Sequence, residues 1–382
     1  MNFSRLKDFL DYYLPMLGVP GSDTVIYKDH EEIFRHQSGY DNLKYRTPMR
    51  EDALHHVYSC TKIATCVAAL QLIERGEILI NDPIHVYFPE YKNLQIARRG
   101  ADGKVRLEKA KSPILIRHLF SMTSGIDYSI RRQSIERIKK LTEGRCPTLD
   151  VVRALAEDPL VCEPGERYVY GLSHDILGGL VELISGMKLG DYMKKNIFDP
   201  LGMKDTTFEI GKHNYERIAT QYEYDSVGRC AVEVLKDSNI MCFGSEYQSG
   251  GAGLLSTVDD FVLLTDALAN GGVGKNGARI LSRAAVDLLC SASLTETQSV
   301  SFEVSHNAGY DYGLGVRVMR DPAKAGSLAP KGVFGWDGKK MCLSVSDPEN
   351  KLAIFHAEEI DGMNPILIPR LMNVIYSCLD EE

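Results

Sequence analysis

Apolar residues recur at helical spacing in several stretches of the chain. Between residues 59 and 75, Ile63, Val67, Leu70 and Ile73 fall on one face of a helix, and Gly76 stands where a C-terminal cap is expected. This pattern predicts an amphipathic helix over residues 59–75. Similar spacing predicts further helices over residues 2–17, 116–122, 176–184, 259–269 and 366–378.

Short strand-like runs occur near both ends of the chain. Residues 25–28 and 32–37 read as a hairpin across a polar turn, and three later runs cover residues 312–318, 340–345 and 352–356. The pattern predicts an α+β fold in which an antiparallel sheet is flanked by the first and last helices. We expect residues 1–90 and 245–382 to form this sheet region and residues 91–244 to form a mostly helical inserted region. The two would make one catalytic unit, with a cleft at their junction.

Composition and charge narrow the class of protein. The chain has 382 residues, 44% hydrophobic and 25% charged, with a formal net charge of −8, which disfavours nucleic acid as a partner. No apolar run reaches the roughly 18 residues of a membrane helix, and Asp8 and Asp11 interrupt the apolar N-terminal stretch. Nine scattered cysteines without a CxxC pair indicate reduced thiols and no zinc site. We therefore expect a cytoplasmic protein without a metal or cofactor, and with neither nucleic acid nor a membrane as its partner.

The candidate chemistry is a Ser-x-x-Lys tetrad at a helix start. Serine and lysine three positions apart share a helical face, so the amine can reach the hydroxyl, and the helix N-terminus favours an oxyanion. The tetrad occurs three times, beginning at Ser4, Ser59 and Ser185. Ser4 lies at the chain start, and Ser185 ends a predicted helix with Gly186 as its cap. Only Ser59 opens a long helix, although a plain N-cap serine is the simpler interpretation of the tetrad alone.

Several segments follow one another in an order that resembles one family. They are Val57-Tyr58-Ser59-Cys60-Thr61-Lys62, residues 117–125 (RHLFSMTSG), residues 164–170 (PGERYVY), residues 249–257 (SGGAGLLST) and residues 335–338 (GWDG). Together they resemble the serine β-lactamase and penicillin-binding-protein family, which includes esterases and D-aminopeptidases. The resemblance implies the β-lactamase/transpeptidase-like fold and an acyl-enzyme mechanism.

Two motifs depart from the family pattern. The second, usually Tyr-x-Asn, is here Tyr170-Gly171-Leu172, so the asparagine is lost. The third, usually Lys-Thr-Gly or His-x-Gly, is Trp336-Asp337-Gly338, so the cation that receives a substrate carboxylate is replaced by an indole. Some family esterases and acyltransferases carry Tyr-Ser-Leu at the second motif, and the chain resembles them more than antibiotic-hydrolysing enzymes.

The resemblance implies roles for individual residues. Ser59 is expected to attack a carbonyl, Lys62 to take its proton or stabilise a tyrosinate, and Tyr170 to pass that proton to the leaving group. The backbone N–H groups of Ser59 and Lys339 are expected to form the oxyanion hole. Lys339 and Lys340 are expected to face solvent, with replacement of the lost cation as the alternative. The expected substrate-binding residues are Leu172, Trp336, Asp337, Gly338, Tyr222 and Tyr224.

Three functions remain open from the sequence. The favoured one is a serine hydrolase for a small ester or amide, most simply an esterase. The second is a D-amino-acid peptidase, an amidase or a weak β-lactamase, which the changed second and third motifs disfavour. The third is a catalytically silent ligand-binding module on the same fold, which the intact Ser59, Lys62 and Tyr170 disfavour. Neither the natural substrate nor the oligomeric state follows from the sequence.

Overall fold

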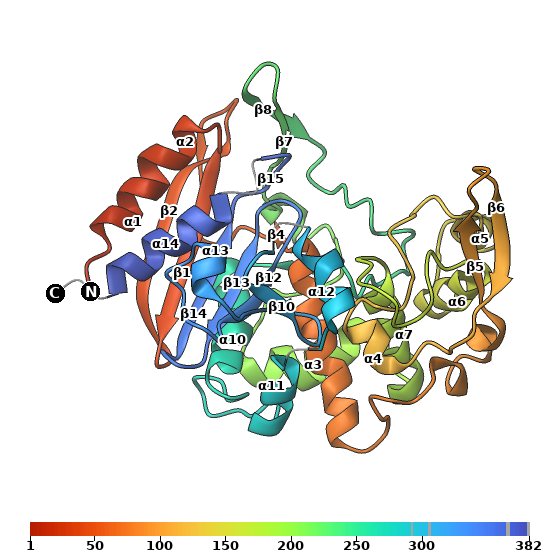
Figure 1. The fold of residues 1–382 in the computed structure, drawn as a ribbon. Helices are drawn as coiled ribbons and strands as arrows, with labels where there is room; N and C mark the ends of the chain where they lie inside the picture. Colours follow the sequence, from red (N-terminus) through yellow and green to blue (C-terminus); the bar gives the residue numbers. More distant parts are fainter. Residues whose placement is uncertain (292, 305–306, 364–366, 380–382) are drawn as a thin grey trace.

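An eight-stranded antiparallel sheet organises the molecule (Figure 1), as the sequence predicted. The computed structural model describes residues 1–291, 293–304, 307–363 and 367–379. The strands follow one another across the sheet as β10 (Tyr310–Tyr312), β11 (Arg317–Met319), β12 (Phe334–Asp337), β13 (Leu343–Asp347), β14 (Leu352–Ala357), β1 (Gly21–Lys28), β2 (Glu31–Asn42) and β3 (Thr47–Pro48). The predicted hairpin of residues 25–37 is thus the β1–β2 pair, with longer strands.

Helices cover both faces of this sheet. The N-terminal helical stretch (α1 Ser4–Asp8, a π-helical turn Phe9–Tyr13 and α2 Leu14–Met16) lies beside the C-terminal helix α14 (Leu367–Leu379) on one face (Figure 1). There, Leu10 and Ile375 share a buried cluster with Ile354 of β14. Side chains alternate along a strand, so the next residue, Phe355, faces the other side. Its ring packs on Phe261 of α10 (Val258–Ala269), with ring centroids 4.7 Å apart.

The helix that follows the serine tetrad is buried on all sides. A 3₁₀ turn (Tyr58–Cys60) leads into α3 (Thr61–Glu74), and every side chain from Thr61 to Leu72 is buried. The predicted amphipathic pattern is therefore wrong. The reason is position: α3 lies between the sheet and the helices of the middle of the chain (Figure 1), so none of its faces meets water over this range.

The middle of the chain is mostly helical but also holds two hairpins that the sequence did not predict. The helices are α4 (Ile116–Phe120), α5 (Gln133–Leu141), α6 (Thr148–Ala154), α7 (Ser173–Ser185), α8 (Leu189–Met193) and α9 (Asp199–Leu201). The hairpins are β5 (Gln95–Arg99) with β6 (Val105–Lys109), and β7 (Gln221–Asp225) with β8 (Cys230–Val234). The division at residues 90 and 245 stays a prediction.

In the C-terminal part, some predicted element boundaries differ from those in the structure. The predicted strand 312–318 is two strands, β10 and β11, because Gly315 turns the chain with φ +91° at a point where a Cβ would collide with the Cys66 sulfur. The predicted helix 366–378 corresponds to α14, and Ile366 lies outside the described residues. The other α-helices among the described residues are α11 (Arg283–Leu289), α12 (Glu296–Glu303) and α13 (Pro322–Ala325).

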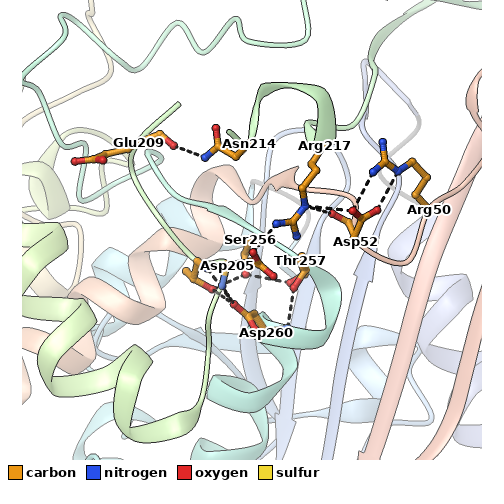
Figure 2. A network of polar contacts seen from close by, with 10 residues as sticks. Arg50, Asp52, Asp205, Glu209, Asn214, Arg217, Ser256, Thr257 and Asp260 are labelled. Atoms are coloured by element: carbon orange, nitrogen blue, oxygen red, sulfur yellow. Dashed lines mark hydrogen bonds and ion pairs between the residues drawn. The ribbon is translucent and has the colours of Figure 1, made fainter. Parts of the chain in front are cut away.

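A polar network fixes the segment that leads into the tetrad. Figure 2 shows Arg217, which donates from Nη1 to Asp205 (2.6 Å) and from Nε to the Asp52 carbonyl (3.0 Å). Asp260 accepts the backbone N–H of Asp205 at 2.6 Å. The chain then pairs as β4 (His55–His56) with β9 (Leu255–Ser256), directly before the 3₁₀ turn.

Two further observations bear on the expectations from composition. In the described part of the chain, no helix is long and apolar enough to cross a membrane. All nine cysteines are free thiols, and most are buried.

Candidate active site

A cavity of about 560 Å³ opens beside Ser59. Its walls are mainly apolar and aromatic, and they come from the 3₁₀ turn, the end of β12 and several loops. Such a lining, with a few convergent polar groups, is typical of a small-molecule site. The lining residues are Tyr58, Ser59, Tyr128, Ile130, Tyr170, Ile240, Met241, Ala252, Trp336, Asp337, Gly338, Lys339, Met341, Asp361, Gly362, Met363 and Ile368.

Local backbone geometry presents Ser59 to this cavity. Tyr58 has φ +40°, an uncommon conformation for a bulky residue, and it stands directly before the serine. The Tyr58 hydroxyl donates to the side-chain oxygen of Gln221 (2.7 Å), which anchors the strained residue. Ser59 therefore stands partly exposed at the cavity wall while its neighbours on both sides are buried.

Lys62 lies in the first turn of α3 and has no solvent exposure. Its Nζ donates to three oxygens: Ser59 Oγ at 3.0 Å, the Tyr128 hydroxyl at 2.8 Å and the Gly251 carbonyl at 2.6 Å. All three hydrogen-bonding positions of the amine are therefore taken. The structure thus brings Ser59 and Lys62 into direct contact, the arrangement expected of the tetrad.

Tyr128 is a member of the site that sequence reasoning missed. Burial raises the pKa of its hydroxyl well above the usual value, while a hydrogen bond with Ser59 partly opposes this shift. The group therefore stays protonated near neutral pH. It stands three residues after Gly125, in the sequence that follows the segment 117–125 of the resemblance. That proximity was the available signal, but no spacing rule places a loop tyrosine at a lysine.

Tyr170 and Trp336 form an aromatic wall. The indole Nε1–H of Trp336 donates to the Tyr170 hydroxyl at 2.8 Å. The Lys62 Nζ lies 4.8 Å from the centre of the Tyr170 ring, so the lysine meets the face of that ring. The structure therefore places all three residues together, with the Tyr170 hydroxyl bonded to the indole and the Tyr128 hydroxyl bonded to the amine.

Gly338 lets the end of β12 approach the serine segment. A Cβ on this residue would lie 2.5 Å from the Val57 carbonyl oxygen, closer than any real contact allows. Ser59 and Lys339 consequently line the same cavity. Their joint role as an oxyanion hole stays a prediction.

Asp175 is a second buried group that the sequence analysis missed, and it positions the turn that binds Lys62. The Asp175 carboxylate accepts the hydroxyls of Ser249 (2.6 Å) and Tyr247 (2.7 Å), and burial raises its pKa. It thereby holds the turn of residues 249–251, whose last carbonyl accepts from Lys62.

Comparison with known proteins now identifies the family. The Beta-lactamase family model matches residues 6–357. The chain belongs to the beta-lactamase family. It is 30% identical to the acyltransferase calJ of Penicillium decumbens (90% of this chain, 84% of the relative) and 28% identical to the esterase EstB of Burkholderia gladioli (88% and 84%). The simvastatin synthase LovD of Aspergillus terreus shares the fold, with a TM-score of 0.81 at 20% identity over 99% of this chain and 98% of LovD.

Membership of the beta-lactamase family confirms the predicted fold and the family resemblance. The family comprises serine hydrolases and acyltransferases, with an esterase and an acyltransferase among the relatives of this chain. The residues of the two other Ser-x-x-Lys tetrads do not line the cavity. Ser4 is exposed at the start of α1, and Ser185 is the last residue of α7, where its hydroxyl donates to the Val181 carbonyl at 2.6 Å.

Two of the expected substrate-binding residues do not lie at the cavity. Tyr222 and Tyr224 do not line the cavity, because β7 pairs with β15 (Ile360–Asp361) and the Tyr222 hydroxyl is bonded to the Asp41 carbonyl and the Leu43 N–H.

Two further expectations need correction. Leu172 is fully buried directly before α7 and does not reach the cavity. Lys340, expected to face solvent, is buried and donates to the Tyr222 carbonyl at 3.0 Å. Of the expected substrate-binding residues, Trp336, Asp337 and Gly338 remain at the cavity.

Proposed function

We propose that the protein hydrolyses small uncharged carboxylic esters through an acyl-enzyme on Ser59. The observation that carries this proposal is the 3.0 Å contact between Lys62 Nζ and Ser59 Oγ at the wall of an apolar cavity. A nucleophile with a base in hydrogen-bond reach is the arrangement that nucleophilic catalysis requires. A cytoplasmic location, inferred from the dispersed free thiols, belongs to the same proposal.

Acylation begins when Ser59 Oγ forms a bond to the ester carbonyl carbon. Its proton passes to the neutral amine of Lys62, whose lone pair faces Ser59 Oγ while its two N–H groups donate to the Tyr128 hydroxyl and the Gly251 carbonyl. The backbone N–H groups of Ser59 and Lys339 hold the oxyanion. Collapse of the tetrahedral intermediate breaks the bond to the alcohol oxygen, which takes the proton from a tyrosine hydroxyl, and the tyrosine in turn takes the serine-derived proton from Lys62. Tyr128 and Tyr170 are the two candidates for this transfer, because both adjoin Lys62.

Deacylation repeats these steps with water as the nucleophile. Water gives a proton to the lysine and tyrosine pair, its oxygen bonds to the acyl carbon, and Ser59 Oγ leaves with a proton. The net reaction is ester plus water to acid plus alcohol. The apolar lining from Ile130, Ile240, Met241 and Met363 suits an acyl chain or an apolar alcohol.

Transfer of the acyl group to a second alcohol is the other candidate activity. It is favoured by the apolar cavity of about 560 Å³, which leaves room for a bulky acceptor, and by the acyltransferase relative. Adding 1-butanol to the ester assay separates the two. Butyl ester formation that competes with acid release indicates transfer, and acid release alone indicates hydrolysis.

The test of the proposal is a pre-steady-state assay with p-nitrophenyl butyrate. We expect a burst of p-nitrophenol close to one equivalent of enzyme when deacylation is slow, and steady turnover otherwise. Ser59→Ala should remove both. Ser185→Ala is the matched control, since this serine also stands three residues before a lysine. Unchanged turnover in Ser59→Ala, or loss in Ser185→Ala, contradicts the proposal.

A further inference from the structure

Two cations lie in the walls around the third motif, and each is paired with a carboxylate. Lys339 and Asp361 both line the active-site cavity, and Lys339 Nζ lies 2.9 Å from Asp361 Oδ2. Arg317, on β11, forms an ion pair with Asp337, the middle residue of the third motif. Both carboxylates belong to the cavity wall, so the charges of each pair cancel there.

The Arg317 guanidinium is held close to the active site. It lies 5.5 Å from the Tyr310 ring centre and 5.7 Å from that of Trp336, so two aromatic rings fix its position. It lines a second cavity of about 230 Å³. This cavity adjoins the first, because residues such as Trp336 and Asp337 line both.

The position of Arg317 has a consequence for substrates that carry a charge. An acyl chain that enters along Trp336 and ends in a carboxylate would reach Arg317 only by competing with Asp337. Because Asp337 and Asp361 offset the charges of Arg317 and Lys339, an approaching anion finds no net positive charge in the cavity wall to compensate its loss of hydration. An uncharged chain needs no such compensation, since the aromatic and methionine lining accepts it.

We propose that Asp337 and Asp361 restrict this enzyme to uncharged substrates by neutralising Arg317 and Lys339. Asp337 is the stronger determinant, because the Arg317 side chain is 17% exposed whereas that of Lys339 is 43% exposed and screened by water. The inference rests on the proposed ester hydrolysis. It goes further by giving a reason why Arg317, although it lies beside the third motif, does not bind a substrate carboxylate.

The experiment compares two esters of equal acyl length. Mono-p-nitrophenyl adipate carries a terminal carboxylate, and p-nitrophenyl hexanoate does not. The measured quantity is the ratio of their kcat/KM values in the wild type, Asp337→Asn, Asp361→Asn and the double variant Arg317→Gln/Asp337→Asn. Using a ratio removes any general loss of activity, and thermal melting confirms that each variant is folded.

We expect Asp337→Asn to raise the adipate-to-hexanoate ratio on the order of ten- to a hundredfold, the range of one charged hydrogen bond. Asp361→Asn should raise it only severalfold. The double variant should return to the wild-type ratio, because the released cation is gone. An unchanged ratio in Asp337→Asn, or a rise that persists in the double variant, overturns the inference.

A binding measurement separates this inference from the proposed function. Trp336 is the single tryptophan of the chain and lies at the cavity, so its fluorescence reports binding. N-phenyl adipamic acid and N-phenylhexanamide are the stable probes. A wild type that hydrolyses neither ester defeats the proposed function alone, while the affinity ratio of the two amides still has to rise in Asp337→Asn. If Asp337→Asn does not fold, the severalfold rise in Asp361→Asn decides, and its absence overturns the inference.

Discussion

Removing the Tyr128 hydroxyl tests how the proton leaves the active site. Tyr128→Phe keeps the ring, over which Lys62 Nζ lies 5.5 Å from the centre, and deletes the acceptor at 2.8 Å. A hydrogen bond from a charged donor contributes about 1.5–3 kcal/mol. If this contribution is needed in the transition state, kcat falls by roughly ten- to a hundredfold. The loss arises because the Lys62 amine, which has taken the serine proton in the transition state, is left with one unpaired N–H and Ser59 loses a neighbour.

The assay is steady-state hydrolysis of p-nitrophenyl butyrate with kcat and KM determined separately. A proton-transfer role lowers kcat and leaves KM nearly unchanged. Tyr87→Phe is the control, since its hydroxyl donates to Asp82 at 2.6 Å and does not line the cavity. Tyr170→Phe is compared alongside. If Tyr128→Phe retains wild-type kcat while Tyr170→Phe loses a hundredfold or more, Tyr170 alone carries the proton and our reasoning on Tyr128 is wrong.

Three further predictions concern the aromatic wall, the substrate and pH. Trp336→Phe removes the donor to the Tyr170 hydroxyl and should lower kcat by roughly two- to tenfold, measured with the same ester; a rate above wild type contradicts the role of that bond. A short p-nitrophenyl ester should have a higher kcat/KM than a chromogenic cephalosporin, and the reverse order shows that a cation does receive the carboxylate. Burial lowers the pKa of His174 to about 3, with the charge of Lys62 acting in the same direction. Below about pH 6.5 the unfolded state then takes up a proton that the folded state does not, so stability falls as the pH is lowered towards 3. Urea unfolding from pH 7.5 to 4.5 should show a loss of unfolding free energy that is about 3 kcal/mol smaller in His174→Gln than in the wild type, and an identical loss in that variant would point to other groups.

The sheet and the serine tetrad were predictable because their signals are local. Alternating and helical spacing describe one element at a time, and Ser59 and Lys62 meet through the geometry of a single turn. Gly338 of the third motif was also predicted from the sequence. The structure gives the reason for a glycine there, because a Cβ would lie too close to the Val57 carbonyl oxygen.

The remaining site residues come together only through tertiary structure. Tyr128 reaches Lys62 across 66 positions of sequence, and Arg317 meets Asp337 because β11 and β12 are neighbours. The expectation that Tyr222 lies at the cavity failed for the same reason, because the tertiary pairing of β7 with β15 decides where its side chain lies.

The burial of α3 on all sides could not be predicted from the sequence for a related reason. Its polar positions include Thr65, which a helical pattern assigns to a solvent face, and Lys62, which was expected beside Ser59. Both donate to backbone carbonyls of the glycine turn at residues 250–251. Such partners are distant in sequence, so the pattern of one helix cannot reveal them.

The central claim is that Ser59 is the residue that becomes acylated. Incubation with a fluorophosphonate probe, followed by mass spectrometry of the intact protein and its peptides, tests it directly. We expect one equivalent of label on the peptide that contains Ser59, and no label in Ser59→Ala. Labelling at Ser4 or Ser185, or an unlabelled wild-type protein that still hydrolyses esters, would contradict the account.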